Sequence, residues 1–273
     1  STAQTVTFHP DSTFNALPDY VFSGCGSLTS VSVPAMVVSI GKEAFSNCKA
    51  LSDIQFAENG KLQQIDGYAF KNTAFTEFVF PNTVINVGEK VFSGCKQLRS
   101  VTLSLKMTSV TYNTFDCGTL EAIHVPEGHS SLMDEDGVLY NKSKTTLYLY
   151  PQQKDPTGFA LPNTLVIIRS YALKGFQGTH LILPETLETI EGYAFQYSAL
   201  TSIHIPAKVK TIGAYAFQAN SSGKLQSVTF EENGALKTIS NYAFAGNTWL
   251  TRIDLPDNIT SLGTYAFEGC YRL

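Results

Sequence analysis

The sequence predicts a solenoid of stacked coils, because one phrase of apolar residues returns about every 23 residues along a chain of 273. The phrase has three parts: a short apolar strand that ends in Pro, an Ile-Gly-like turn, and a small residue followed by Phe. A repeat of this length is typical of coils that contact only their neighbours. We therefore expect one linear core, filled by the same repeat positions in about ten coils.

The first part of each coil is predicted to be a strand. Leu200, Ile203 and Ile205 show the pattern, since apolar residues two apart indicate a strand with one buried side. Pro206 then ends the strand, because proline cannot donate a backbone hydrogen bond to a neighbouring strand. Stacked coils would place these strands side by side, as a parallel sheet on one face of the solenoid.

The second part is predicted to be a short turn that brings the chain back to the core. Between Gly213 and Phe217 there is room for about one turn of helix, after which the Phe points to the interior. In six coils the position two residues after the Phe is Gly or Asn, which suits left-handed backbone. The core position is occupied by Phe22, Phe45, Phe70, Phe92, Phe115, Leu173, Phe195, Phe217, Phe244 and Phe267. The left-handed position is occupied by Gly24, Asn47, Asn72, Gly94, Gly246 and Gly269.

Irregular spacings each fall in one loop, as a solenoid requires. The Pro turn is replaced by the longer turns A-E-N-G at 57–60 and E-E-N-G at 231–234, and residues 221–223 lengthen another loop. The largest departure is an oversized coil at 127–160, in which two apolar segments around 141–144 predict a β-hairpin within 136–151. A hairpin that covers the core is favoured over a dedicated ligand arm. The predicted domain organisation is a single solenoid over 1–273 that contains this insertion.

Composition argues against two functional classes. The net charge is −4 and no Lys/Arg cluster follows one face, which argues against a nucleic-acid-binding surface. No apolar stretch reaches the length needed to cross a bilayer, so we expect no membrane insertion. Residues 1–5 are compatible with a start that follows a removed signal peptide.

The repeated pattern L-x-x-I-x-L-P, V-x-x-I-G-x-x-A-F and a following Cys, from about Phe14 to Leu273, resembles the BspA-like (Treponema-type) leucine-rich repeat family. The segment D-G-V-L-Y-N-K at 136–142 is similar to one that the family carries. The resemblance implies a right-handed leucine-rich repeat solenoid exposed on the surface of a bacterium or protist. It also implies a similarity to adhesins that bind host matrix proteins, other microbes or epithelial cells.

Four of the five cysteines lie three residues after the repeat Phe, at Cys25, Cys48, Cys95 and Cys270. A ladder of buried thiols is favoured over a disulfide framework, because free Cys behaves as a small apolar residue. Cys25 and Cys48 lie on neighbouring coils and are the pair to test for a bond. The remaining cysteine, Cys117, lies one residue earlier in its coil.

No residue set in the sequence predicts catalysis, a metal or a cofactor. Of the five histidines, His180 and His204 lie on adjacent coils and are interpreted as solvated surface residues, because they lack a third ligand for a metal. The Asp134–Gly137 segment lacks the later bidentate Glu of a calcium loop. The sequence also contains neither a nucleophile elbow nor a phosphate-binding Gly loop.

The outward positions of the predicted sheet are the best candidates for binding, because stacking places one repeat position in a row down the face. This sheet face comprises Ser30, Asp53, Glu77, Ser100, His124, His180, Ser202, His204, Thr229, Arg252 and Asp254. Few of these residues are the aromatic or Arg anchors of protein interfaces, so ordinary solvation of the sheet stays open as an alternative. A competing row, Tyr68, Tyr193, Tyr215, Tyr242 and Tyr265, is expected to pack between coils.

Three functional hypotheses follow. The leading one is a non-catalytic cell-surface recognition module that binds a host matrix protein, a host cell surface or a glycan through the sheet face. The alternative is a structural spacer that holds another domain away from the cell and has no ligand of its own. A hydrolase acting on surface polysaccharide has only general Ser, Thr and acid content in its favour.

Overall fold

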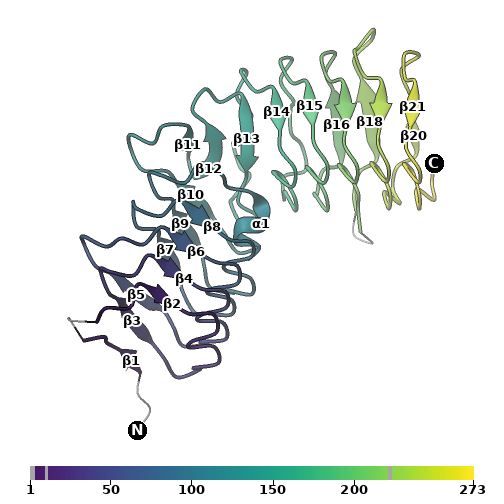
Figure 1. Cartoon of the computed structure of the whole chain (residues 1–273). Helices are drawn as coiled ribbons and strands as arrows, with labels where there is room; N and C mark the ends of the chain where they lie inside the picture. Colours follow the sequence, from purple (N-terminus) through teal and green to yellow (C-terminus); the bar gives the residue numbers. More distant parts are fainter. Residues whose placement is uncertain (1–3, 10–11, 221–222) are drawn as a thin grey trace. The chain divides into compact units, whose positions relative to one another are not determined.

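The computed structural model describes residues 4–9, 12–220 and 223–273. These residues form about 11 turns of about 23 residues, with parallel sheets and almost no helix, which confirms the leucine-rich repeat solenoid as the fold class (Figure 1). The chain divides into two compact units, Ser1–Val138 and Leu139–Leu273. A single solenoid over 1–273 stays a prediction, and the lengthened loop at 221–222 lies outside the described residues.

The first unit contains two kinds of parallel sheet. One set of strands forms two three-stranded sheets, in the orders β1-β3-β5 and β7-β9-β10, and a second set, all of two residues, forms a sheet in the order β2-β4-β6-β8. The first set is β1 (Thr5–Val6), β3 (Ser30–Val33), β5 (Asp53–Phe56), β7 (Glu77–Val79), β9 (Ser100–Thr102) and β10 (Ala122–His124). The others are β2 (Ala16–Leu17), β4 (Ser39–Ile40), β6 (Gln64–Ile65) and β8 (Asn86–Val87), followed by helix α1 (Tyr112–Phe115) and β11 (Leu132–Glu135).

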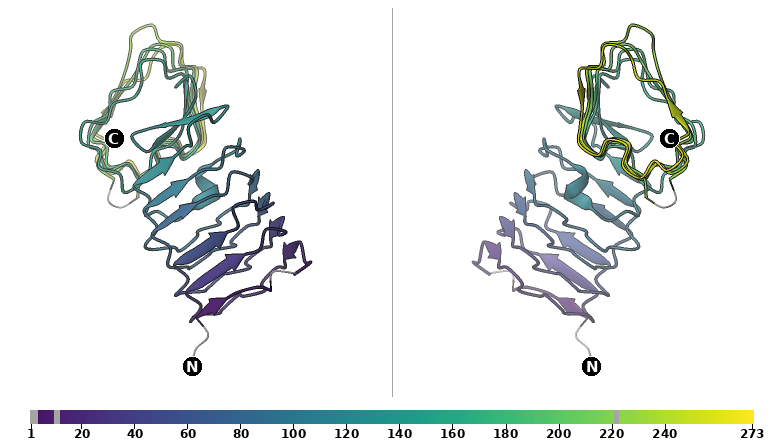
Figure 2. Two further views of the ribbon diagram at one scale, coloured as in Figure 1. Left: turned by 90° about the vertical axis from the view of Figure 1, so that its left-hand side faces the viewer. Right: turned by 90° about the vertical axis from the view of Figure 1, so that its right-hand side faces the viewer.

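The second unit repeats this arrangement, and Figure 2 shows its coils nearly end-on, each lying over the one before it. One sheet has the order β16-β18-β20, from Ser202–Ile205, Ser227–Phe230 and Arg252–Ile253. The other runs from β12 (Val138–Asn141) through β13 (Thr146–Leu149), β14 (Ile167–Ile168), β15 (Thr189–Ile190), β17 (Thr211–Ile212) and β19 (Thr238–Ile239) to β21 (Ser261–Leu262).

The sequence analysis did not predict the sheet of two-residue strands. It predicted one helical turn directly after such a strand, as at 213–217. Only α1, at residues 112–115, is helical within the described ranges. In the other coils the backbone N–H groups alternate: Phe195 N–H donates to Ala216 O of the next coil at 2.7 Å, whereas Gln196 N–H donates to Tyr193 O of its own turn at 3.1 Å. A backbone N–H that bonds between coils is not available for a helical bond to the residue four earlier. The expected short turns are therefore present as hydrogen-bonded turns, and only α1 is a helix within the described ranges.

The core follows the predicted repeat positions. The Phe side chains stack in a column, with ring centroids 5.3 Å apart for Phe22 and Phe45 and 4.9 Å apart for Phe195 and Phe217. The left-handed position is confirmed as well, because Gly24, Asn47, Asn72, Gly94, Gly246 and Gly269 all have φ between 56° and 80°. The residue two before the Phe is also left-handed in most coils, as in Tyr193 with φ 60°.

The oversized coil contributes strands to the core instead of a free arm. Strands β12 and β13 pair in antiparallel fashion, and β13 then pairs in parallel with β14. Leu139 and Leu147 are buried, and the buried ring of Tyr150 lies 4.6 Å from that of Phe159 and 5.1 Å from that of Phe176. Burial of both strands favours a hairpin that covers the core over a dedicated ligand arm.

In the part of the chain that the structure describes, no helix has the length and apolar character that crossing a bilayer requires.

Candidate functional site

The strand register brings the predicted sheet-face residues together in short groups. In the first unit Ser30 pairs with Asp53, and Glu77 pairs with Ser100. The row is interrupted between these two pairs, because β5 and β7 belong to separate sheets and the long turn at 57–60 follows β5. His124 pairs with Thr102 in the sheet of β7, β9 and β10.

The second unit holds a stretch of the sheet face on β16, β18 and β20. Ser202 pairs with Ser227, which pairs with Arg252, and His204 pairs with Thr229. Within β16 the burial alternates, with Ile203 and Ile205 buried and His204 exposed. The predicted inner and outer sides of this strand are therefore confirmed. Asp254 directly follows β20, whereas His180 lies outside any strand.

Hydrogen bonds and ion pairs connect neighbouring coils on this face. His204 Nδ1 lies 2.9 Å from Thr229 Oγ1, and His204 Nε2 lies 3.1 Å from Glu231 Oε2. Arg252 Nε donates to both carboxylate oxygens of Asp254, at 3.0 and 2.8 Å, and these bonds raise the pKa of the guanidinium. The side chains are strongly exposed, so the pairs orient polar groups at the surface more than they stabilise the fold.

The outward positions two residues after Glu77 and His180 carry apolar side chains. Ile182 is 88% exposed and Val79 is 59% exposed, although both occupy strand-like repeat positions. Exposed apolar groups between polar ones give a surface that can both exclude water from a partner and donate hydrogen bonds to it.

One histidine, His129, is buried. His129 is 1% exposed, its Nε2 lies 2.8 Å from Met107 O, and its Nδ1 accepts hydrogen bonds from the backbone N–H groups of Ser131 and Leu132. Since Nδ1 accepts, Nε2 carries the proton and donates to Met107, so the ring is neutral. The side chain holds the start of the oversized coil in place. His124 is exposed, and its Nδ1 lies 3.8 Å from Asp134 Oδ2.

The described residues contain no group of three or more His, Cys, Asp or Glu side chains placed to hold a metal ion. Asp134, at the start of the calcium-like segment, instead accepts backbone hydrogen bonds from Val125 at 2.7 Å and Gly137 at 3.2 Å. Its carboxylate thus fixes the tight turn before β12.

The cysteines form an interrupted thiol ladder, and all five are free. Cys48 Sγ donates to Phe22 O at 3.1 Å, and Cys95 Sγ donates to Phe70 O at 3.1 Å, so each thiol bonds the core Phe of the preceding coil. Burial raises the pKa of both thiols to about 11. The prediction of buried thiols is correct for these two and wrong for Cys25, which is exposed, while Cys270 is half-buried.

Thiol reactivity should follow this division. In native protein at about pH 8 we expect a disulfide reagent such as DTNB to label Cys25 rapidly, because exposure and thiolate formation govern attack. Cys48 and Cys95 should react only after unfolding, since both are buried and their pKa lies well above the pH of the assay. The Cys25→Ser variant is the control and should lose the rapid phase; rapid labelling in that variant at Cys48 or Cys95 would contradict the burial.

Four tyrosines of the predicted row, Tyr193, Tyr215, Tyr242 and Tyr265, pack between coils as predicted, and Tyr171 extends the row by one coil. Tyr68 lies in the first unit, where the ammonium of Lys71 lies 5.4 Å from its ring centroid. Ring centroids lie 4.6 Å apart for Tyr171 and Tyr193, 4.8 Å for Tyr193 and Tyr215, and 4.7 Å for Tyr215 and Tyr242. Tyr265 follows at 5.0 Å. Because these rings are stacked on each other, the faces of the inner ones are occupied and cannot stack on a sugar ring.

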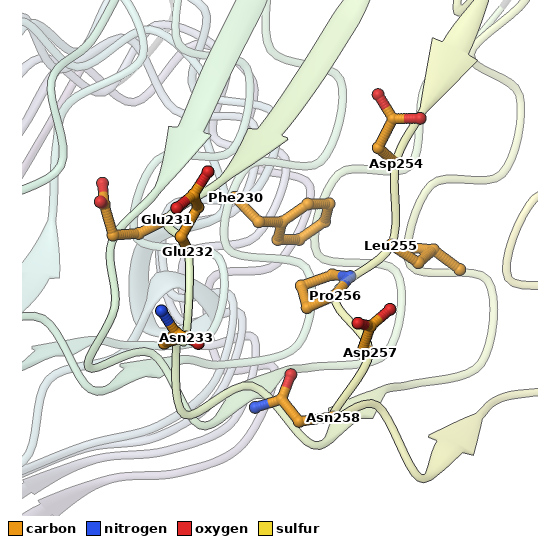
Figure 3. A pocket seen from close by; sticks show the side chains of 9 residues that line it. All are labelled: Phe230, Glu231, Glu232, Asn233, Asp254, Leu255, Pro256, Asp257 and Asn258. Atoms are coloured by element: carbon orange, nitrogen blue, oxygen red, sulfur yellow. The ribbon is translucent and has the colours of Figure 1, made fainter.

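Two hollows were missed by the sequence analysis. The first hollow, of about 400 Å³, lies between the long turn at 57–60 and the Pro turn at 81–83. The second hollow, of about 570 Å³, lies between the long turn at 231–233 and the Pro turn at 256–258 (Figure 3). The signal for both was present in the sequence, because each follows a turn lengthened by A-E-N-G or E-E-N-G. A long turn beside a shorter one leaves space between two coils.

The family described as BspA type Leucine rich repeat region (6 copies) matches residues 15–145 and 148–273, which together are nearly the whole chain. None of the curated proteins matches the chain.

Among solved structures, the chain is similar to a leucine-rich repeat protein from Eubacterium ventriosum, with 23% identity and a TM-score of 0.70 over 93% of this chain and 80% of that one. It is similar to a leucine rich cell surface protein from Faecalibacterium prausnitzii, with 23% identity and a TM-score of 0.66 over 100% of this chain and 87% of that one. The pneumococcal vaccine antigen PcpA has 26% identity and a TM-score of 0.52, and this chain spans 56% of its length. These likenesses support the solenoid fold.

Proposed function

Because the chain belongs to the BspA-type leucine-rich repeat family, we propose that it is a non-catalytic recognition module, which binds a host protein or glycan at a cell surface through its sheet face. The observation that carries the proposal is the register of β16, β18 and β20, which lines up outward side chains from successive coils. A rigid row of this kind matches an extended partner better than a small substrate.

The chemistry of the face supports binding more than catalysis. Ser202, His204 and Thr229 offer hydroxyl and imidazole groups at fixed spacing, and Ile182 adds an exposed apolar side chain. Hydroxyl and imidazole groups can each donate and accept hydrogen bonds, which suits both protein backbones and sugar hydroxyls. The Faecalibacterium protein, described as a cell surface protein, supports the proposed location.

The proposal is tested with the purified chain and a panel of matrix proteins and glycans, measured by surface plasmon resonance. We expect saturable binding to at least one member, and loss of that binding in the variant Ser202→Lys/His204→Lys/Thr229→Lys, because three long cations would block the face. The control carries the same charge change at Thr157, Gln177 and Thr264, which are exposed and lie outside the sheet face.

Retention of binding by the sheet-face variant would assign the interaction to another surface. Absence of binding across the whole panel would overturn the proposal and favour the spacer function, in which the chain has no ligand of its own.

A further inference from the structure

We propose that the second hollow binds an arginine or lysine side chain of the partner recognised by the sheet face, an inference that rests on the proposed function. The hollow adjoins that face directly. Asp254 belongs to the outward row and lines the hollow, and Glu231, which follows β18, lies 3.1 Å from His204 of the same face. A partner lying along β16, β18 and β20 would therefore pass the mouth of the hollow.

The shape and lining of the hollow fit a long cationic side chain. Phe230, Leu255 and Pro256 supply apolar surface, and Figure 3 shows the ring of Phe230 between the long turn and the next coil. The side-chain amide of Asn258 donates to the backbone oxygen of Gly234, which ties the two turns together below the hollow. Lys and Arg have an apolar stem and a charged end, so the stem can cover the apolar surface while the end meets carboxylates.

The charge of the hollow complements such a side chain. Figure 3 shows Glu231 and Glu232 on one side and Asp254 and Asp257 on the other. Asp254 is paired with Arg252, and Glu231 is in contact with His204, whereas Glu232 and Asp257 form no ion pair with any described residue. These two carboxylates can therefore accept hydrogen bonds from an incoming cation. The four groups are not arranged to hold a metal ion within the described chain.

The first hollow shows that the turn does not require this charge. It also lies beside a lengthened turn, with Phe56 at the position of Phe230 and Glu58 at the position of Glu232. The positions of Glu231, Asp254 and Asp257 are uncharged in the first hollow. They are occupied there by Ala57, Val79 and Asn82, respectively. The acidic lining of the second hollow is therefore not required by the turn, and it complements a cationic side chain.

The test uses the whole chain and a short Gly/Ser peptide with one central Arg, titrated while backbone amide NMR signals are recorded. We expect saturable shifts at Asn233, Gly234 and Asn258, and no such shifts with a peptide in which citrulline, a neutral isostere, replaces the Arg. The variant Glu232→Gln/Asp257→Asn should lower the affinity for the Arg peptide about 10-fold, because two charge-assisted contacts are lost.

The matched control Glu127→Gln/Glu185→Gln changes the net charge by the same amount at exposed residues away from the hollow. We expect it to bind the Arg peptide as tightly as the unaltered chain. Equal weakening in both variants, or shifts at the first hollow as large as those at the second, would overturn the inference, because either would reflect general attraction to a negative protein.

The outcome is separable from that of the proposed function. If a panel partner binds the sheet face but binds the Glu232→Gln/Asp257→Asn variant unchanged, the inference about the hollow fails while the proposed function stands. If no panel partner binds, the proposed function fails, and the peptide titration still reports on the hollow itself.

Discussion

Replacing Phe217 with Ala is expected to lower the free energy of unfolding of the second unit by about 3 to 5 kcal/mol. The side chain is 3% exposed, and its ring stacks between those of Phe195, at 4.9 Å, and Phe244, at 5.2 Å. Truncation would remove both ring contacts and leave a cavity that the neighbouring coils cannot fill without moving. Urea unfolding followed by circular dichroism measures the loss.

The matched change Ser202→Ala should be nearly silent, since Ser202 lies on the outer side of β16 and only a small polar group is removed. The comparison tests the assignment of inner and outer positions throughout the repeat. Equal unfolding midpoints for the two variants would show that this assignment is wrong.

Replacing Gly213 with Ala is expected to destabilise the second unit by about 3 kcal/mol, through overpacking between coils. A Cβ atom at this position would lie 2.4 Å from the backbone nitrogen of Gly192 and 2.6 Å from the carbonyl carbon of Glu191. Both atoms are backbone, so no side chain can rotate away and the two coils must separate. Thermal unfolding should show a lower midpoint.

Gly26→Ala provides the control, because the nearest atom to its added Cβ would be Gly24 O at 3.9 Å. We expect its thermal midpoint to match that of the unaltered chain. A Gly213→Ala variant as stable as the Gly26→Ala variant would contradict the close approach of coils at the Ile-Gly turn.

The register of the coils was predictable because burial imposes it. A Phe such as Phe195 has to return to the same column in every coil, and a strand such as β16 has to turn Ile203 and Ile205 inward, so the sequence repeats where the core repeats. The left-handed Gly and Asn after the Phe were predictable because these two residue types adopt that backbone conformation most readily, whereas the left-handed residue before the Phe, such as Tyr193, carries no such signal.

The sheet of two-residue strands was not predictable from local pattern. A segment such as Thr211–Ile212 is too short to show an alternation, and its hydrogen bonds go to equivalent residues about one coil away. Bonds to the next coil also limit the segment after each such strand to a hydrogen-bonded turn, where the sequence analysis expected a helical turn. A local reading of 211–217 therefore identified the turn and its buried Phe but not the hydrogen-bonding partners.

The candidate site was predicted in part. Periodicity placed Ser202 and Arg252 on one face, and the register pairs each of them with Ser227. The hollow beside that row was missed, because it arises from the difference in length between two neighbouring turns rather than from either turn alone. Burial of His129 was missed because its partner, Met107 O, belongs to the preceding coil.

The most direct test of recognition through the sheet face is amide hydrogen exchange of the chain with and without a bound panel partner. Recognition through that face predicts slower exchange in β16 and β18 and at the mouth of the second hollow, with the amides of β17 and β19 unchanged. Protection confined to β17, β19 and the tyrosine row would contradict it, because the partner would then lie on the other sheet.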